Sequence, residues 1–181
     1  MKQKSEKIVV IGGGDYGKIV ISLLKKINLF EIIGYTDKKN RGKILNIKYL
    51  GDDSVLKKLH IESNIKFAAI GVGQLQNADI KKNIVLGLKE IGYTFPTIIS
   101  PTAIVNEEVL IGEGTIIRDN AVISASTKIG KFTIIGTSVN ISYNTTIGDF
   151  TNISIGSNIG IEINIGNEVL IGMGSTVMNY K

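Results

Sequence analysis

An unbroken six-residue period in the second half of the chain constrains the fold more than any other feature. Counting in sixes from Ile99 to Val177 meets fourteen positions, and every one of them is Ile or Val. Glycine directly follows seven of the fourteen. A period of six fits neither an α-helix nor a simple β-hairpin. It predicts a parallel β-helix with three flat faces per coil, in which each hexad forms one face and points its Ile or Val inward.

Residues eighteen apart should stack on adjacent coils of such a helix. We therefore expect an amide ladder between Asn140 and Asn158, and a column of glycines at one corner. Glycine suits a corner because it has no Cβ to crowd the next coil. The expected column is Gly112, Gly130, Gly148 and Gly166.

The composition changes near Pro96. Residues 1–96 carry 17 Lys and Arg against 9 Asp and Glu, whereas residues 97–181 carry 4 against 7. We predict an α/β + β chain, with a Rossmann-like domain over 1–96 and a left-handed β-helix over 97–181. The basic first part suits an anionic ligand such as a nucleotide. Nucleic acid is disfavoured, because the lysines are scattered along predicted helices, where solvated faces account for most of them.

Several classes of protein are disfavoured by composition. No apolar run approaches the roughly 20 residues that span a bilayer, and the N-terminus lacks the pattern of a signal peptide. The chain has no cysteine and one histidine, His60, which we expect to be an ordinary surface residue. Neither a disulfide framework nor a metal site is predicted. We expect a soluble, cytoplasmic protein.

A glycine-rich turn follows the first predicted strand, Ile8–Ile11. The turn has the spacing of a dinucleotide-binding fingerprint and leads into an amphipathic helix over 18–26. Its candidate ligand-binding residues are Gly12, Gly14, Asp15, Tyr16 and Gly17. Glycines allow a phosphate to approach the backbone, and the N-terminus of the helix offers N–H groups and a positive dipole end.

Two further segments belong to this candidate site. A second strand, 32–36, ends in Asp37 and Lys38, where an acidic residue would suit a ribose hydroxyl. A later apolar strand, 67–72, leads into Gly71 to Gln74 at the same carboxyl edge of the sheet. NAD chemistry is a weaker alternative, because about 95 residues cannot hold two mononucleotide-binding halves and a substrate domain. A glycine turn that serves packing alone is the other alternative.

The order of these parts resembles the family of sialic-acid O-acetyltransferases and bacillosamine-type sugar N-acetyltransferases. The resemblance rests on the stretches 11–18, 34–38, 100–103 and 147–150, and covers essentially the whole chain. It implies that the first domain binds a nucleotide-linked amino sugar. It further implies that a homotrimeric β-helix binds acetyl-CoA as co-substrate, near Gly160 and Ile161.

The chain departs from the family at the positions that carry its chemistry. The family's general-base histidine and the acidic residue after it correspond to Tyr143 and Asn144. A second histidine corresponds to Asn152, and the histidine of the first loop to Tyr16. A glycine pair near the acetyl group corresponds to Ile161 and Glu162, and Glu162 should stack on Asn144. We therefore take Tyr143, Asn144 and Glu162 as candidate catalytic residues.

Two functions remain open on the sequence. The first is an acetyl-CoA-dependent O- or N-acyltransferase that acts on a nucleotide-linked sugar in surface glycan or polysaccharide synthesis. The second is a catalytically impaired relative that binds a nucleotide sugar without acyl transfer. The second alternative follows from the missing imidazole, because a tyrosine titrates near 10 and an amide does not titrate usefully.

Overall fold

The structure is a computed structural model that describes residues 5–73 and 78–179. The described residues fall into two compact units, the first made of residues up to 73 with 79–96, and the second of Ala78 with residues from 97 onward. Each unit has its own sheets and its own core. The predicted loop residue Gln74 lies outside the described residues.

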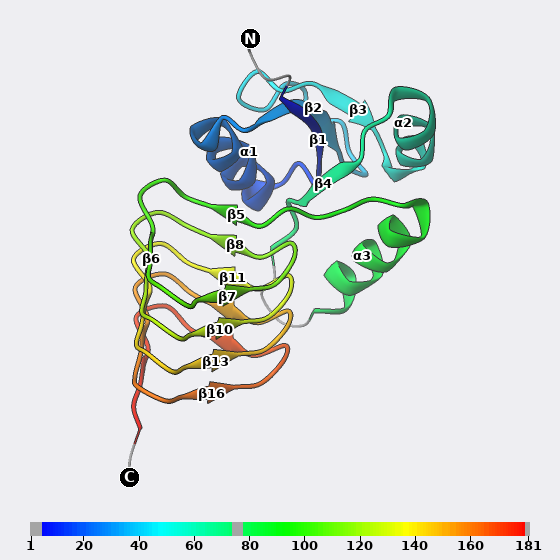
Figure 1. Cartoon of the computed structure of the whole chain (residues 1–181). Helices are drawn as coiled ribbons and strands as arrows, with labels where there is room; N and C mark the ends of the chain where they lie inside the picture. The colour runs from blue at the N-terminus through cyan, green and yellow to red at the C-terminus, as the bar shows by residue number, and fades with distance from the viewer. Residues whose placement is uncertain (1–4, 74–77, 180–181) are drawn as a thin grey trace. The chain divides into compact units, whose positions relative to one another are not determined.

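The first unit is a four-stranded parallel sheet in the order β3-β2-β1-β4, with helices between the strands (Figure 1). Its elements, in chain order, are β1 (Glu6–Ile11), α1 (Asp15–Ile27), β2 (Phe30–Thr36), β3 (Tyr49–Gly51), the 3-10 helix η1 (Asp53–Val55), α2 (Leu56–Ser63), β4 (Phe67–Ile70) and α3 (Asp79–Ile91). Strand β1 is buried from Ile8 to Ile11, as expected of the centre of a parallel sheet. This confirms the predicted Rossmann-like fold.

Helix α1 begins three residues earlier than the sequence pattern suggested. Gly14 is its N-cap residue, and Asp15 lies in the first turn, where a carboxylate suits the positive end of the helix dipole. Lys25 and Lys26 occupy the last turn, and Asn28 caps it in a left-handed conformation with φ 54°. The glycine turn therefore leads directly into the N-terminus of a well-formed helix.

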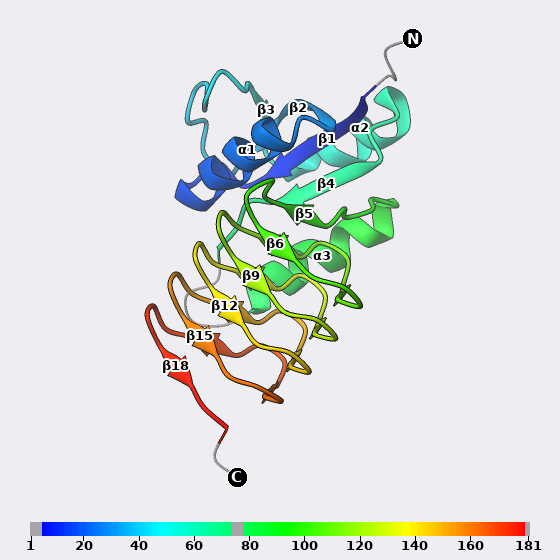
Figure 2. The same ribbon diagram turned by 60° about the vertical axis from the view of Figure 1, so that its left-hand side comes forward.

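The second unit is a left-handed parallel β-helix, as predicted. Each hexad contributes one two-residue strand, and strands eighteen residues apart pair in parallel to form three sheets. Figure 2 shows one of these faces, on which β6 (Ile104–Val105), β9 (Val122–Ile123), β12 (Asn140–Ile141), β15 (Asn158–Ile159) and β18 (Thr176–Val177) stack in order. The other faces are β5 (Ile98–Ile99), β8 (Ile116–Ile117), β11 (Ile134–Ile135), β14 (Asn152–Ile153) and β17 (Leu170–Ile171), and β7 (Leu110–Ile111), β10 (Lys128–Ile129), β13 (Thr146–Ile147) and β16 (Asn164–Ile165).

The isoleucines at steps of six form the core of the β-helix. Ile117, Ile123, Ile135 and Ile153 are completely buried. The expected ladder is present, because the side-chain amide of Asn140 donates to Asn158 Oδ1 at 2.9 Å. The glycine column is present too: a Cβ on Gly148 would lie 2.5 Å from the backbone carbon of Gly166.

Buried hydroxyls form a second interior layer that the sequence pattern did not reveal. Thr133 Oγ1 donates to the carbonyl of Gly148 at 2.8 Å and accepts from the N–H of Thr151 at 3.3 Å. Thr151 repeats the arrangement one coil on, with Gly166 and Val169. These hydroxyls pair backbone groups at the corners that the strand ladders leave over, and a buried unpaired group would cost about 1–3 kcal/mol.

The expectation that His60 is an ordinary surface residue is wrong, and one lysine of the first unit is buried. His60 is half-buried: its ring packs 4.9 Å from the ring of Tyr93, and Nδ1 lies 3.1 Å from the carbonyl of Ile65. Lys81 of α3 is an exception among the lysines of the first unit, because it is only 3% exposed. Burial lowers the pKa of Lys81 to about 7. Both side chains are therefore part of the packing of the first unit.

Candidate functional site

The carboxyl ends of β1, β2 and β4 bring the predicted ligand-binding residues together. Gly12 donates its N–H to the carbonyl of Thr36 at 2.8 Å, and Gly71 donates to Ile11 at 2.7 Å. The glycine turn, the end of β2 and the loop after β4 are thereby joined through their backbones. This is the edge at which ligands bind in parallel α/β sheets.

Three of the predicted glycines are required by packing. Gly12 has φ +102°, and a Cβ there would lie 2.9 Å from the carbonyl oxygen of Gly71. A Cβ on Gly71 would lie 2.9 Å from the Cα of Gly17, and one on Gly17 would collide with the carbonyl of Gly12. These contacts show that Gly12, Gly17 and Gly71 have a packing role, because they let helix, turn and loop approach one another closely.

Gly14 differs from these three, because a Cβ at this position would meet no atom within 4 Å. Its open side faces solvent at the start of α1. Within the described part of the chain, no group accepts a hydrogen bond from the N–H of Gly14 or Asp15. Free N–H groups at the N-terminus of a helix suit an anion such as a phosphate. Tyr16, also predicted here, is half-buried in the same turn.

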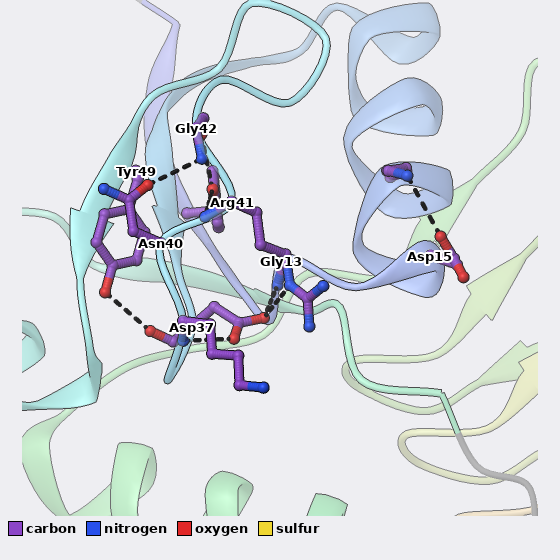
Figure 3. A network of polar contacts seen from close by, with 10 residues as sticks. Gly13, Asp15, Asp37, Asn40, Arg41, Gly42 and Tyr49 are labelled. Carbon is purple, nitrogen blue, oxygen red and sulfur yellow. Dashed lines mark hydrogen bonds and ion pairs between the residues drawn. The ribbon is translucent and has the colours of Figure 1, made fainter.

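Asp37 connects the glycine turn to the loop that follows β2 (Figure 3). Its Oδ2 accepts from the N–H of Gly13 at 2.8 Å and from Arg41 Nε at 3.3 Å, and its Oδ1 accepts from the N–H of Lys39 at 2.9 Å. Burial raises the pKa of the Asp37 carboxyl, but these hydrogen bonds and the charge of Arg41 together bring it below its ordinary value. The predicted ribose acceptor is therefore already engaged with the protein.

The loop after Asp37 is fastened at several points. The hydroxyl of Tyr35, a fully buried residue, donates to the carbonyl of Gly42 at 2.7 Å and accepts from the N–H of Arg41 at 3.3 Å. Asn40 accepts from the N–H of Gly42, and Lys25 donates to the carbonyl of Leu45. This loop carries a series of cations, Lys38, Lys39, Arg41, Lys43 and Lys48. Their backbone is held in place before any ligand arrives.

Two clefts lie at this edge, both lined in part by Arg41. The first has a volume of about 480 Å³ and is basic; it is lined by Gly13, Gly14, Asp15, Lys18, Arg41, Lys43, Ile44 and Leu45. The second has a volume of about 310 Å³ and is mainly apolar; it is lined by Ile11, Gly12, Thr36, Asp37, Lys38, Lys39, Arg41, Asp53, Val72, Ile80 and Ile84. A basic cleft next to an apolar one matches the two ends of a nucleotide.

The candidate catalytic residues lie in the second unit, at the corner that follows β12 and β15. The N–H of Glu162 donates to the carbonyl of Tyr143 at 3.1 Å. Asn144 and Glu162 both have left-handed backbones, with φ 57° and 55°. The expected stacking of Glu162 on Asn144 is therefore present, and Tyr143, with 48% of its surface exposed, lies beside them.

Gly160 and Ile161, the two residues predicted to contact CoA, differ in hydrogen bonding and in exposure. The N–H of Gly160 donates to the carbonyl of Val177 at 2.8 Å, and its carbonyl accepts from Thr145 Oγ1 at 3.0 Å. Gly160 is thus engaged in the coil on both sides. Ile161 follows it at the corner and is 40% exposed.

Residues 7–86 match the family model of the PglD N-terminal domain. No curated protein sequence matches the chain.

Solved structures of similar fold align with both units of this chain. A His-to-Asn variant of perosamine N-acetyltransferase from Caulobacter crescentus, in complex with CoA and GDP-perosamine, is 22% identical; the match covers 94% of this chain and 88% of that chain, with a TM-score of 0.81. The acetyltransferase domain of PglB from Neisseria gonorrhoeae FA1090 is 22% identical over 96% of this chain and 91% of that chain, with a TM-score of 0.80.

The same Neisseria domain in complex with acetyl coenzyme A is 24% identical, over 96% of this chain and 85% of that chain, with a TM-score of 0.77. These matches confirm the predicted fold over nearly the whole chain. With the family match, they support the resemblance to bacillosamine-type sugar N-acetyltransferases that the sequence suggested.

No group of three or more His, Cys, Asp or Glu within 5–73 and 78–179 is placed to hold a metal ion. Among the helices of these residues, none combines the length and the apolar character that a bilayer crossing requires.

Proposed function

We propose that this protein transfers an acetyl group from acetyl-CoA to the amino group of a nucleotide-linked sugar, in surface glycan or polysaccharide synthesis. The observation that supports this most strongly is the union of two parts in one chain. A PglD-type N-terminal domain precedes a β-helix, and both align together with perosamine N-acetyltransferase over 94% of this chain. The non-catalytic alternative gains no support from the comparisons.

The ligands of the similar structures support the choice of substrates. Perosamine N-acetyltransferase is in complex with CoA and GDP-perosamine, and the PglB domain with acetyl coenzyme A. By analogy, the first unit would hold the nucleotide-linked amino sugar and the β-helix would hold acetyl-CoA. In the first unit, the basic cleft at Gly14, Lys18 and Arg41 would take the phosphates, which suits its charge.

The reaction would be a direct transfer. The lone pair of the sugar amine attacks the thioester carbon of acetyl-CoA, the carbon–sulfur bond breaks, and CoA leaves as a thiolate. The nitrogen then loses a proton, either to a general base or, finally, to the thiolate. Holding amine and thioester in contact supplies several kcal/mol of the barrier without any acid or base, because positioning replaces a bimolecular encounter.

No imidazole is present among Tyr143, Asn144 and Glu162, so the proton acceptor must be another group. The single histidine, His60, lies in α2 and is engaged with Ile65 and Tyr93. Glu162 is the carboxylate next to Tyr143 and Asn144 at the β-helix corner, and we propose it as the acceptor. Tyr143 and Asn144 would orient the sugar, since a phenol and an amide both make hydrogen bonds.

A thiol-release assay with acetyl-CoA and a panel of GDP-, UDP-, CDP- and CMP-linked amino sugars tests the proposal. We expect turnover with at least one sugar, a fall of about 10²-fold or more in Glu162→Gln, typical of a lost general base, and a smaller fall in Tyr143→Phe. The matched control is Glu168→Gln, an exposed carboxylate with the same left-handed backbone at another corner. Nucleotide-sugar binding without any thiol release would support the non-catalytic alternative instead.

A further inference from the structure

The apolar cleft at the carboxyl edge of the sheet has the lining expected of a nucleobase site. Val72, Ile80 and Ile84 supply its aliphatic surface, from the loop after β4 and from α3. Each also belongs to the first unit, so the cleft is formed within one compact body. Apolar walls with a few fixed polar groups are typical of small-molecule sites, where the polar groups set specificity.

One carboxylate in this cleft is held in place and has capacity for a ligand. Asp53 Oδ1 accepts from the hydroxyl of Thr36 at 2.7 Å, and Thr36 is completely buried at the end of β2. Among the described residues, Asp53 makes no other side-chain hydrogen bond or ion pair. Asp37, the other carboxylate of the cleft, already accepts from Gly13, Lys39 and Arg41. Asp53 is therefore the acceptor available to a base.

A carboxylate discriminates among nucleobases by their donor edges. Guanine presents two adjacent donors, N1–H and the N2 amino group, which pair with the two oxygens of a carboxylate. Uracil flanks its N3–H with carbonyl oxygens that a carboxylate repels, and cytosine and adenine place a ring acceptor next to their amino groups. The cleft also carries Lys38 and Lys39, whose cations suit the O6 and N7 acceptors of guanine.

We infer that the nucleotide of the substrate is a guanosine diphosphate and that Asp53 selects guanine by accepting from N1–H and the N2 amino group. This inference rests on the proposed function, since it names the base of the proposed nucleotide-linked sugar. Thr36 fixes the orientation of the carboxylate, and the aliphatic walls cover the faces of the ring. Asp53 is thus a specificity-determining residue.

Equilibrium binding of GDP, IDP and UDP to the full chain tests the inference. IDP differs from GDP only by lacking the N2 amino group. We expect GDP to bind about tenfold or more tightly than IDP, and more tightly than UDP, because a hydrogen bond to a charged group is lost. In Asp53→Asn, which keeps an oxygen for Thr36, the GDP affinity falls and the gap between GDP and IDP closes.

The neighbouring Asp52→Asn is the control, because Asp52 accepts from the N–H of Ser54 and does not line the cleft. It should keep the wild-type preference. Equal affinity of the wild type for GDP and IDP, a preference for UDP, or an unchanged gap in Asp53→Asn would overturn the inference while leaving nucleotide binding intact. Failure of every nucleotide to bind would instead contradict the proposed function itself.

Discussion

The carboxylate of Asp37 joins two segments that a nucleotide would have to contact together. It accepts from the N–H of Gly13 in the glycine turn and from Arg41 in the basic loop. Hydrogen bonds to a charged acceptor are roughly twice as strong as neutral ones. At the scale of single residues, Asp37 therefore holds Gly13 and Arg41, two residues that line the basic cleft, in a fixed arrangement.

Substituting Asp37→Asn should loosen this cleft. The amide group that replaces one oxygen cannot accept from both Gly13 and Arg41, so we expect a loss of about 1–3 kcal/mol in the free energy of unfolding and about tenfold weaker nucleotide binding. Glu62→Gln is the control, because the Glu62 side chain is 63% exposed, pairs with Lys58 within α2 and lines neither cleft. Urea unfolding and nucleotide titration measure the two effects.

The stability difference for Asp37→Asn should also depend on pH. The pKa of Asp37 is lowered in the folded protein, so its contribution is present above its ordinary pKa of 3.8 and is lost as the pH falls through the folded value. We expect the difference between wild type and variant to shrink when unfolding is measured near pH 3 instead of pH 7. An undiminished difference at low pH would show that the charge of Asp37 does not matter.

Lys81, in contrast to Asp37, should destabilise the folded protein, and most strongly at acidic and neutral pH. Burial lowers its pKa from 10.5 to about 7, so the unfolded chain binds the proton more tightly and the folded state is disfavoured at lower pH. That penalty is fully present below about pH 7 and is relieved as the pH rises towards 10.5. Lys81→Met should therefore stabilise the protein most at pH 6 and least at pH 10, in thermal or urea unfolding. A gain that is constant with pH would refute this.

The sequence located Asp37 but did not reveal its role, and it did not single out Lys81. The spacing after the glycine turn predicted an acidic residue for a ribose, and Asp37 stands there, but the pattern could not show that protein donors occupy its oxygens. Lys81 carries no signal of burial, because a lysine on an amphipathic helix reads as solvated. Asp53 was missed altogether; its signal, a carboxylate just after the third strand, is visible only when the sheet places it beside Thr36.

At the scale of elements, the coil of the β-helix was the most predictable part of the chain. A core position every six residues leaves one arrangement that buries all of them, and the strands pair eighteen residues apart as that arrangement requires. The buried threonines were predictable as small or β-branched residues, but their hydrogen bonds to corner carbonyls such as that of Gly148 were not. Those bonds depend on the turn geometry, which the period does not specify.

The glycine column offers a matched pair of substitutions. A Cβ on Gly148 would collide with Asn167 and lie 2.5 Å from the backbone of Gly166, whereas a Cβ on Gly166 meets nothing within 4 Å. Gly148→Ala should therefore destabilise the protein by about 1–3 kcal/mol, as overpacking does. Gly166→Ala should change stability by less than about 0.5 kcal/mol. Urea midpoints give both values, and equal effects would contradict the stacking of the corners.

At the scale of the whole molecule, we propose a homotrimer. Exposed apolar side chains lie at the corners that flank β12, β15 and β18, on one face of the β-helix: Tyr143, Ile155, Ile161 and Met173, which are between 40% and 76% exposed. A three-sided prism can bury such a side against its copies, and cyclic symmetry closes the assembly. The proposed acetyl-CoA site at Ile161 would then adjoin a second copy.

Sedimentation velocity at micromolar concentration should therefore give three times the mass of one chain. Met173→Glu should shift the protein towards monomers, because it places a charge in the proposed interface. Leu110→Glu is the control, since Leu110 is 62% exposed on a different face of the β-helix. A wild-type monomer under these conditions would exclude a site shared between subunits.

Transfer of the acetyl group to the sugar nitrogen is the central claim, and product analysis tests it most directly. The purified protein is incubated with isotopically labelled acetyl-CoA and a GDP-linked amino sugar, and the product is analysed by mass spectrometry and NMR. We predict a sugar nucleotide that has gained one labelled acetyl group on its amine, at a rate that depends on the protein. No labelled sugar, across GDP-, UDP-, CDP- and CMP-linked amino sugars that bind the protein, would contradict the proposal.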